Sequence, residues 1–290
     1  MYYSLLMIDK CIHMSDYPLP HVGYTAKNRL NAGVGIMSLA HYLAKKGLKY
    51  STLEGKQEMH RVAERHMYFA IKASLRLGKE LGNAPWIHRT KWAEGWTPLD
   101  TYNKNVDKIV DYQMNQYDWG QLKSEIIANG GIRNSALVAY MPGESSSKAS
   151  GGFNSIYPAR DLNLIKTDGH HKVYWTAPDS DTLANQYELA WDVPVKDQID
   201  MYGIFQKWTD MSISADLFQR ILGDDKISSD DMLQHVFQMY SVGMKTQYYT
   251  NMKMSKEVNL DHSNNNGVIE PEAFLTNDAT AGCESGACTL

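Results

Sequence analysis

The sequence has little cysteine, no long apolar run and no strong charge of either sign. Three cysteines among 290 residues are too few for the disulfide framework of a secreted protein. No apolar stretch approaches the roughly 20 residues that cross a bilayer, and residues 1–10 lack the basic region and cleavage site of a signal peptide. We therefore expect a cytoplasmic protein with no membrane partner, in which a cysteine pair favours redox chemistry over a structural disulfide.

The charge balance excludes a general affinity for nucleic acid. The net charge is −4 and the isoelectric point about 6.2, so the chain carries no basic excess for phosphate backbones. Hydrophobic residues make up 43% and charged residues 21%, which is typical of globular proteins. The length allows one large domain or two smaller ones.

Hydrophobic spacing and turn residues predict an alternation of helices and strands, with irregular chain over residues 85–103 and in most of 148–178. Such an alternation indicates an α/β architecture. Gly33 and Gly35 are expected to permit close backbone packing, and Gly47 to end a helix. The predicted helices span residues 1–14, 33–47, 54–82, 119–128, 180–191, 197–209 and 229–242, and the predicted strands 135–141, 171–176, 211–215 and 245–250.

The composition changes near residue 250. Residues 1–250 carry the apolar periodicity of a folded domain, whereas 251–290 are polar and poor in aromatic residues. We expect this last segment to be a flexible tail. Roughly 30 residues of flexible chain reach on the order of 30 Å, enough to carry a side chain from a buried pocket to the surface.

Two of the three cysteines, Cys283 and Cys288, lie five positions apart in this tail. Thiol–disulfide exchange needs exposure and mobility more than burial, so a redox relay is the favoured hypothesis. Zinc binding and two idle thiols are the alternatives. Zinc needs four ligands, and His262 alone lies near the pair; we predict no metal site.

Two other motifs have both a functional and an ordinary interpretation. Pro142-Gly-Glu-Ser-Ser-Ser147 follows a predicted strand, and a hydroxyl-rich turn that opens a helix offers amide groups to an anion. The same residues could simply cap the helix.

Tyr248 and Tyr249 lie in a predicted strand, where neighbours face opposite sides, so one would be buried and the other would meet an interface. Two strand-forming residues are the plain alternative.

The remaining candidates carry weaker signals. Cys11 lies on the first predicted helix and is expected to be a small buried side chain. The His170-His171 pair precedes a strand, where an exposed hairpin is more typical than a metal site. Arg160 could pair with an anion or lie at the surface. The tryptophans Trp86, Trp92 and Trp96 are expected to pack beneath an irregular segment.

In order along the chain, these segments resemble the C-terminal part of the large, catalytic subunit of class I ribonucleotide reductase. The similarity covers nearly the whole chain, and the terminal cysteine motif is its most specific part. The segments that carry it are Asp16-Tyr-Pro-Leu-Pro20, Ala32-Gly-Val-Gly-Ile36, Ala40-His-Tyr-Leu-Ala-Lys45, Leu99-Asp-Thr-Tyr102, Arg133-Asn-Ser135, Met141-Pro-Gly-Glu-Ser-Ser-Ser147, Ser212-Ile-Ser-Ala215, Lys245-Thr-Gln-Tyr-Tyr249 and Cys283-Glu-Ser-Gly-Ala-Cys288.

The resemblance implies a fold and a role for each matching residue. The fold would be the latter part of a ten-stranded α/β barrel. Tyr248 and Tyr249 match the stacked tyrosines that relay a radical from the small subunit. Cys283 and Cys288 match the tail pair that re-reduces the active-site disulfide and is itself reduced by thioredoxin or glutaredoxin. The residues that match the loop binding the substrate diphosphate are Pro142, Gly143, Glu144, Ser145 and Ser146.

Two positions depart from the family pattern. Gly143 stands where relatives usually carry Ser, which removes one hydroxyl but leaves the backbone donors. Tyr157 stands where a Glu-Pro pair is common, so the loop after the phosphate motif is expected to be altered.

The family's radical cysteine and its active-site disulfide lie upstream of the matched region, and Cys11 cannot replace them. We therefore expect a C-terminal polypeptide of a split large subunit, which needs an N-terminal polypeptide and the small subunit. The effector sites for ATP and dNTP would lie on the N-terminal polypeptide, and the di-iron tyrosyl radical on the small subunit; this chain would bind no cofactor itself. The alternative is a defunct remnant or a thiol-relay partner without reductase activity.

Overall fold

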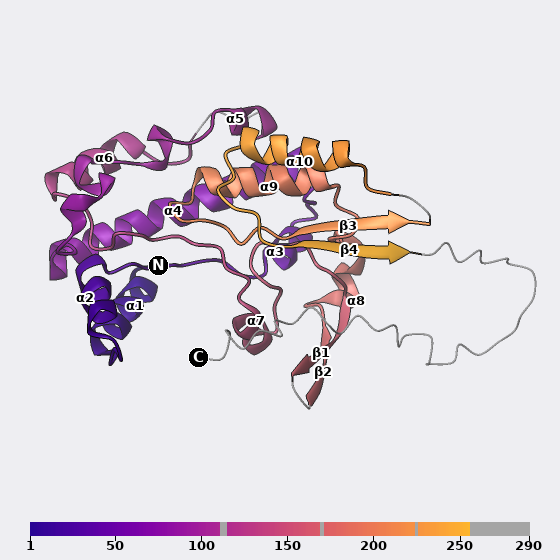
Figure 1. Ribbon diagram of the computed structural model, residues 1–290, viewed down its shortest axis with the longest axis horizontal. Coiled ribbons are helices and arrows are strands. Elements are labelled where there is room, and N and C mark those ends of the chain that lie inside the picture. Colours follow the sequence, from indigo (N-terminus) through magenta and orange to yellow (C-terminus); the bar gives the residue numbers. More distant parts are fainter. Residues whose placement is uncertain (111–114, 169–170, 224–225, 256–290) are drawn as a thin grey trace, which may run out of the picture.

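The computed structural model describes residues 1–110, 115–168, 171–223 and 226–255 (Figure 1). Cys283, Cys288 and the rest of the predicted tail from residue 256 lie outside them. The α-helices are α1 (Tyr2–Met14), α2 (Pro20–Arg29), α3 (Leu39–Lys45), α4 (Leu53–Leu81), α5 (Asn105–Val110), α6 (Trp119–Ala128), α7 (Glu144–Ser150), α8 (Ser180–Leu183), α9 (Val195–Lys207) and α10 (Ser229–Ser241). The strands are β1 (Asn163–Asp168), β2 (His171–Thr176), β3 (Leu217–Leu222) and β4 (Thr250–Ser255), and 3₁₀ turns span Ile87–Arg89, Lys91–Glu94, Pro98–Asp100 and Ala184–Gln186.

Extended segments from four places in the chain lie side by side and parallel, and we call them the parallel row: residues 32–34, 136–140, 211–222 and 248–255. Val34 pairs with Val138, and Tyr140 pairs with Ile213. β3 then pairs in parallel with β4. Each return to the row passes through helices, as parallel pairing requires. The predicted α/β architecture is confirmed.

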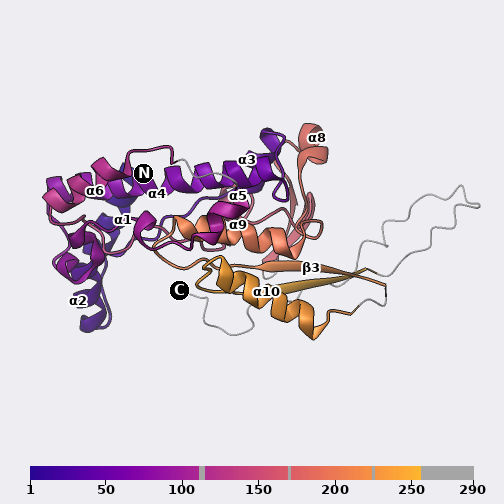
Figure 2. The same ribbon diagram turned by 90° about the horizontal axis from the view of Figure 1, so that it is seen from above.

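The row is covered by long helices. In both views α9 lies between α4 and α10, and α1 and α2 lie at the end of the molecule away from β3 and β4 (Figures 1 and 2). The Thr52 hydroxyl accepts a hydrogen bond from the Gly55 amide at 3.2 Å and caps α4. A Cβ at Gly55 would lie 1.7 Å from the Lys49 carbonyl oxygen, so this first turn requires glycine.

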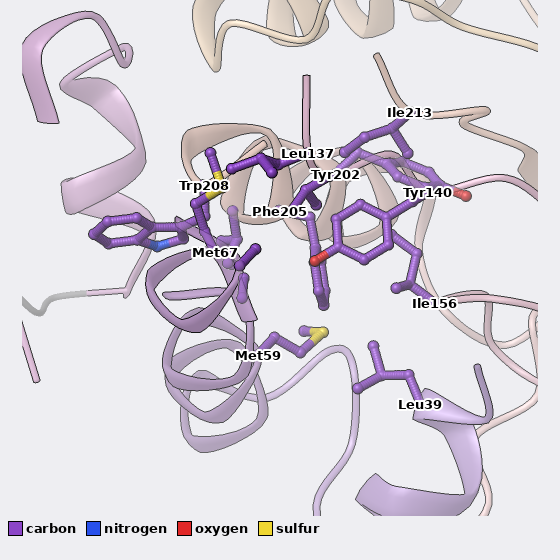
Figure 3. Packing of buried hydrophobic residues seen from close by; sticks show 14 of the residues in the cluster. Leu39, Met59, Met67, Leu137, Tyr140, Ile156, Tyr202, Phe205, Trp208 and Ile213 are labelled. Carbon is purple, nitrogen blue, oxygen red and sulfur yellow. The ribbon is translucent and has the colours of Figure 1, made fainter. Parts of the chain in front are cut away.

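Large buried side chains from α4, α9 and the row fill the core (Figure 3). Trp208, at the end of α9, stacks on Trp119 with ring centroids 5.2 Å apart. His66 Nδ1 and the Tyr140 hydroxyl lie 2.9 Å apart inside this core. Burial lowers the pKa of His66 to about 4, so the ring is neutral at pH 7 and fits an apolar interior.

The helix predicted over residues 33–47 is shorter, because its first part joins the row. Ala32 N–H donates to the Ala136 carbonyl and Val34 N–H to the Leu137 carbonyl, both at 2.9 Å. Only α3, from Leu39, is helical. The predicted close packing at the glycines is confirmed, since a Cβ at Gly35 would lie 2.8 Å from the Ala139 oxygen. Gly47 follows α3 with a φ of +66°, as a helix-ending glycine does.

Other predicted elements divide into matches and errors. The helices predicted at 1–14, 54–82, 119–128, 197–209 and 229–242 are confirmed within two residues as α1, α4, α6, α9 and α10, and β2 as predicted. The segments predicted as strands at 135–141 and 211–215 are extended parts of the row, joined by isolated bridges. The strand predicted at 245–250 is wrong, because regular pairing starts at Thr250, and the helix at 180–191 is wrong, because α8 ends at Leu183. α2, α5, β1, β3 and β4 were not predicted.

A buried ion pair fixes α1 to the end of α4. The Arg133 guanidinium donates to both carboxylate oxygens of Asp9, at 2.7 and 3.0 Å, and also to the carbonyls of Leu81 and Gly82. Asp9 is 2% exposed and Arg133 7%. Four charge-assisted bonds therefore join three separate chain segments.

We predict that Asp9→Ala lowers the free energy of unfolding by about 3–5 kcal/mol, because it leaves a buried guanidinium without its counterion. Urea unfolding followed by circular dichroism measures the change. Asp192→Ala is the matched control, since Asp192 pairs with Arg220 at 2.9 Å at the surface, where such pairs contribute about 0–1 kcal/mol. Equal losses in the two variants would contradict a special role for the buried pair.

Candidate functional site

The motif Pro142–Ser146 contains the turn Pro142-Gly143, which leads from the second segment of the row into α7, and the first three residues of α7. Gly143 has left-handed backbone with φ 66° and is the N-cap of α7. The first bond of the helix runs from Ser147 N–H to the Gly143 oxygen at 2.8 Å. The amides of Glu144, Ser145 and Ser146 therefore precede the helical bonding pattern. The predicted arrangement of extended segment, turn and helix is confirmed.

A pocket of about 270 Å³ lies beside α7 and mixes charged with aromatic side chains. Of the predicted substrate-binding residues, Glu144 is the one that lines it. Among the lining residues, Lys148 and Arg160 carry positive charge and Glu144 carries negative charge. The lining residues are Glu144, Ser147, Lys148, Gly152, Phe153, Asn154, Tyr157, Pro158, Arg160, Leu164 and Trp175.

Hydrogen bonds and ring contacts fix the walls of this pocket. The buried Ser147 hydroxyl contacts the Glu144 carbonyl at 2.8 Å and the Asn154 side-chain oxygen. Phe153 packs edge-on against Trp175, with ring centroids 4.9 Å apart. Trp175 belongs to β2 of the antiparallel hairpin β1–β2, which projects near α7 (Figure 1). The hairpin therefore supplies one wall.

Tyr157 forms another wall, and it is a position where the sequence departs from the family pattern. Its side chain is 4% exposed, and its hydroxyl donates a hydrogen bond to the Ser214 carbonyl. Burial, reinforced by the nearby Asp216 carboxylate, raises the pKa of Tyr157 well above its usual value. The phenol is therefore a permanent donor at neutral pH.

Arg160 combines the two interpretations that the sequence left open. Its side chain is 48% exposed, and its Nη2 lies 3.5 Å from the Asp216 carboxylate. The same guanidinium lies over the ring of Phe218, with Cζ 5.0 Å from the ring centroid. It is a surface arginine that also faces an anion.

Asp216 was missed from the sequence, although it directly follows the Ser212-Ile-Ser-Ala215 segment of the resemblance. It is 4% exposed, and its carboxylate accepts a hydrogen bond from the Tyr249 amide at 3.3 Å. Burial raises the pKa of Asp216, while Arg160 and the Tyr249 amide oppose that rise. A lone acidic residue after a predicted strand carries no sequence signal for such a place.

Tyr248 and Tyr249 lie in the last segment of the row, just before β4. Their ring centroids are 3.9 Å apart and the ring planes meet at 48°. The expectation that one is buried and one exposed is wrong: the side chains are 50% and 47% exposed. Because the pair precedes the regular strand, its side chains do not alternate across a sheet and can touch each other.

The other sequence candidates have plain outcomes. Cys11 is exposed, so the prediction of a buried side chain is wrong. Trp92 is buried and packs edge-on against Trp96 at 4.8 Å, as expected for packing residues. His170 lies outside the described residues. Within the described residues, no group of three or more His, Cys, Asp or Glu side chains is placed to hold a metal ion.

None of the helices in the described ranges is long and apolar enough to cross a membrane.

Comparison with known proteins identifies one family. The family described as "Ribonucleotide reductase, barrel domain" matches residues 1–250 of this chain. This match confirms the predicted fold class.

The chain is also similar to individual large subunits. It is 36% identical over 278 residues to ribonucleoside-diphosphate reductase 1 subunit alpha of Salmonella typhimurium, and 35% identical to that of Escherichia coli. Each alignment covers 95% of this chain and 35% of the relative. The subunit alpha of phage T4 is 30% identical over 85% of this chain and 33% of its own length. The chain thus spans about a third of the length of the relatives that it matches.

Proposed function

The chain belongs to the ribonucleotide reductase family, and we propose that it serves as the C-terminal part of the large subunit of ribonucleoside-diphosphate reductase. It would act in the cytoplasm, where the enzyme reduces ribonucleoside diphosphates to deoxyribonucleoside diphosphates for DNA synthesis. The similarity to subunit alpha over 95% of the chain supports this assignment. In this proposal the chain supplies a diphosphate-binding turn, a radical-transfer pair and a reducing tail.

The observation that carries the proposal is the contact between Tyr248 and Tyr249. Two phenol rings with centroids 3.9 Å apart are close enough to exchange an electron and a proton in one short step. Both rings are about half-exposed, so one can receive the oxidising equivalent from outside this chain. We propose that it comes from the small subunit, whose di-iron tyrosyl radical supplies it, and that it leaves toward the radical cysteine.

The turn Pro142–Ser146 would hold the substrate's diphosphate. Three consecutive amides precede the first bond of α7, and amides at a helix start are suited to phosphate oxygens. Gly143 contributes no hydroxyl, but its φ of 66° turns the chain into α7. Lys148 and Arg160 in the adjoining pocket add positive charge that favours a diphosphate over a neutral nucleoside.

The tail would close the redox cycle. We propose that the Cys283 and Cys288 thiols transfer two electrons and two protons to an active-site disulfide, forming their own disulfide. Thioredoxin or glutaredoxin then reduces that disulfide by thiol–disulfide exchange. Both cysteines lie outside the described residues, so the sequence motif alone supports this step.

We propose further that the radical cysteine, the active-site disulfide and the effector sites lie on the upstream part of the large subunit, which packs against this chain. The chain matches only about a third of its relatives' length, and the family's radical cysteine lies upstream of that third. An exposed apolar face on α10 supports association: Met232, Leu233, Val236, Phe237 and Tyr240 are 53–83% exposed. Such a face is typical of a surface covered in an assembly, and either proposed partner would cover it.

Co-expression tests the proposed function. The chain is produced with an N-terminal polypeptide that carries the upstream part of a large subunit, and the small subunit is then added. We expect CDP or ADP reduction from the assembled enzyme and none from the purified chain alone. Reduction by the chain alone would contradict the assignment of the radical cysteine to the upstream part, and an inactive assembled complex would favour the defunct remnant or the thiol-relay partner.

We predict that Tyr248→Phe or Tyr249→Phe abolishes multiple-turnover reduction in the assembled enzyme, because phenylalanine has no phenolic proton to lose. Nucleotide binding should stay unchanged. Tyr3→Phe, at a side chain that is 76% exposed on α1, is the matched control and should retain full activity. Wild-type turnover in either pair variant would refute the radical-transfer role.

We predict that the Cys283→Ser/Cys288→Ser double variant completes one turnover with a pre-reduced enzyme but does not cycle with thioredoxin. A rapid-quench measurement of product per active site distinguishes the two phases. Cys11→Ser is the control, because Cys11 is exposed on α1. The enzyme that carries this substitution should cycle normally with thioredoxin. Sustained cycling in the double variant would show that the tail does not carry the electrons.

A further inference from the structure

Two walls of the pocket are attached to the chain segment that holds the tyrosine pair. We call residues Ser214–Asp216 the linking segment. On the pocket side, the Tyr157 hydroxyl donates to the Ser214 carbonyl, and Arg160 Nη2 lies 3.5 Å from the Asp216 carboxylate. Both Tyr157 and Arg160 line the pocket.

The other side of the linking segment holds the backbone of the pair. The Ala215 carbonyl accepts a hydrogen bond from Tyr248 N–H at 2.9 Å. The Asp216 carboxylate accepts one from Tyr249 N–H at 3.3 Å. Three consecutive residues therefore separate the pocket wall from the backbone of both tyrosines.

The linking segment is also held from α9. The Tyr202 hydroxyl, fully buried, donates to the Asp216 carbonyl at 2.5 Å. Position 216 is thus fixed through its main chain, while its carboxylate is shared among Arg160, Tyr249 N–H and the Asn251 side chain. A change in the Arg160 contact therefore alters the negative charge that the carboxylate presents to Tyr249 N–H.

Arg160 is the partner that a ligand can reach. Its side chain is 48% exposed, whereas Asp216 is 5% exposed at the side chain. The 3.5 Å separation is long for a charge-assisted bond, which usually measures roughly 2.7–2.9 Å. A phosphate in the pocket would compete with Asp216 for this guanidinium and would leave the buried carboxylate more dependent on Tyr249 N–H.

We propose that Tyr157, Arg160 and Asp216 are positioning residues that couple the occupation of the pocket by a nucleoside diphosphate to the geometry of the Tyr248–Tyr249 pair. The inference rests on the proposed function for the identity of the ligand and the role of the pair. When the diphosphate engages Arg160, the Asp216 carboxylate tightens on Tyr249 N–H. Tyr157 keeps the linking segment seated against the pocket wall, and the pair takes its transfer geometry only when substrate is bound.

Tyr157 does not act as a third relay phenol. Its hydroxyl donates to a carbonyl oxygen, which is not a base that could take its proton, and the ring is 4% exposed. Its role is the hydrogen bond itself, so Tyr157→Phe removes the relevant group and keeps the ring packing.

The test uses the assembled large subunit with 3-fluorotyrosine at position 248, and it follows the ¹⁹F resonance during titration with ADP. This readout needs no turnover. We expect ADP to shift the resonance in the wild-type protein. Asp216→Asn and Tyr157→Phe should bind ADP within about twofold of wild type by calorimetry and lose most of that shift. Arg160→Lys should restore part of a shift that Arg160→Gln removes.

Kinetics in the complete enzyme gives a second readout. Asp216→Asn and Tyr157→Phe should lower kcat by about three- to thirtyfold, the range expected for couplings between neighbouring sites, with little change in KM. Tyr187→Phe is the matched control. Its hydroxyl donates to the Pro178 carbonyl and its ring centroid lies 5.3 Å from that of Phe153; both of these partners lie outside the linking segment.

The outcomes separate this inference from the proposed function. An ADP-induced shift that is unchanged in Asp216→Asn and Tyr157→Phe overturns the coupling, whether or not the enzyme is active. A loss of ADP binding in parallel with the loss of shift also overturns it, because the residues would then only bind. If the assembled protein lacks reductase activity but the variants still lose the shift, the coupling stands and the proposed function fails. Arg160→Gln, at a half-exposed position, covers the case in which a buried variant does not fold; because Arg160 also contacts the diphosphate, its shift is compared with wild type at ADP concentrations that saturate each protein.

Discussion

The parallel row is the constraint on which the rest of the structure depends. Parallel segments cannot be joined by short turns, so every return to the row needs a long connection, and these connections are the helices that cover it. The backbone of the row pairs Val34 with Val138 and Tyr140 with Ile213. Because the second segment leads into α7 and the fourth carries the tyrosines, the same pairing brings the Pro142–Ser146 motif and the Tyr248–Tyr249 pair onto one framework.

Buried polar side chains complete the pairing where the row lacks a regular ladder. The Asp210 carboxylate accepts hydrogen bonds from the amides of Leu137 and Val138, both at 2.8 Å. The Gln198 side chain accepts from Phe218 N–H and donates to the Phe218 carbonyl. Unpaired backbone groups are costly in an interior, so these side chains let irregular segments remain buried. A site built on such segments can place adjacent residues where a regular strand would not.

The tyrosine pair shows the consequence. In a regular strand, neighbouring side chains point to opposite faces, and the two rings could not lie 3.9 Å apart. The pair sits just before β4, where the chain is held by Ala215 and Asp216 rather than by a continuous ladder. The contact therefore depends on the linking segment, and through it on the wall of the neighbouring pocket.

Local pattern predicted well the elements whose signals are local. The helices α4 and α6 follow from apolar spacing with Thr52 or Asp118 as cap, and the turn before α7 follows from Pro142 and Gly143. The errors fall where long-range pairing overrides local preference. Residues 33–37 have a helical pattern, but Val34 in this stretch bonds to the backbone of Leu137 and Ala139. Residues 245–249 have strand composition but precede the regular strand. β3 was missed because no local signal identifies its partner strand, in which Leu217 pairs with Thr250 and Leu222 with Ser255.

The sequence by itself determined the family, the alternation of helices and extended segments, and the residues Pro142–Ser146, Tyr248, Tyr249, Cys283 and Cys288 as candidates. Those signals are carried by residue type and spacing, which folding does not change. The tertiary structure alone decided that Tyr157, Arg160 and Asp216 connect the pocket to the pair, and that both tyrosines share one exposed side. These three residues are up to 59 positions apart in the chain. Their contacts exist only because parallel pairing brings the segments that carry them side by side.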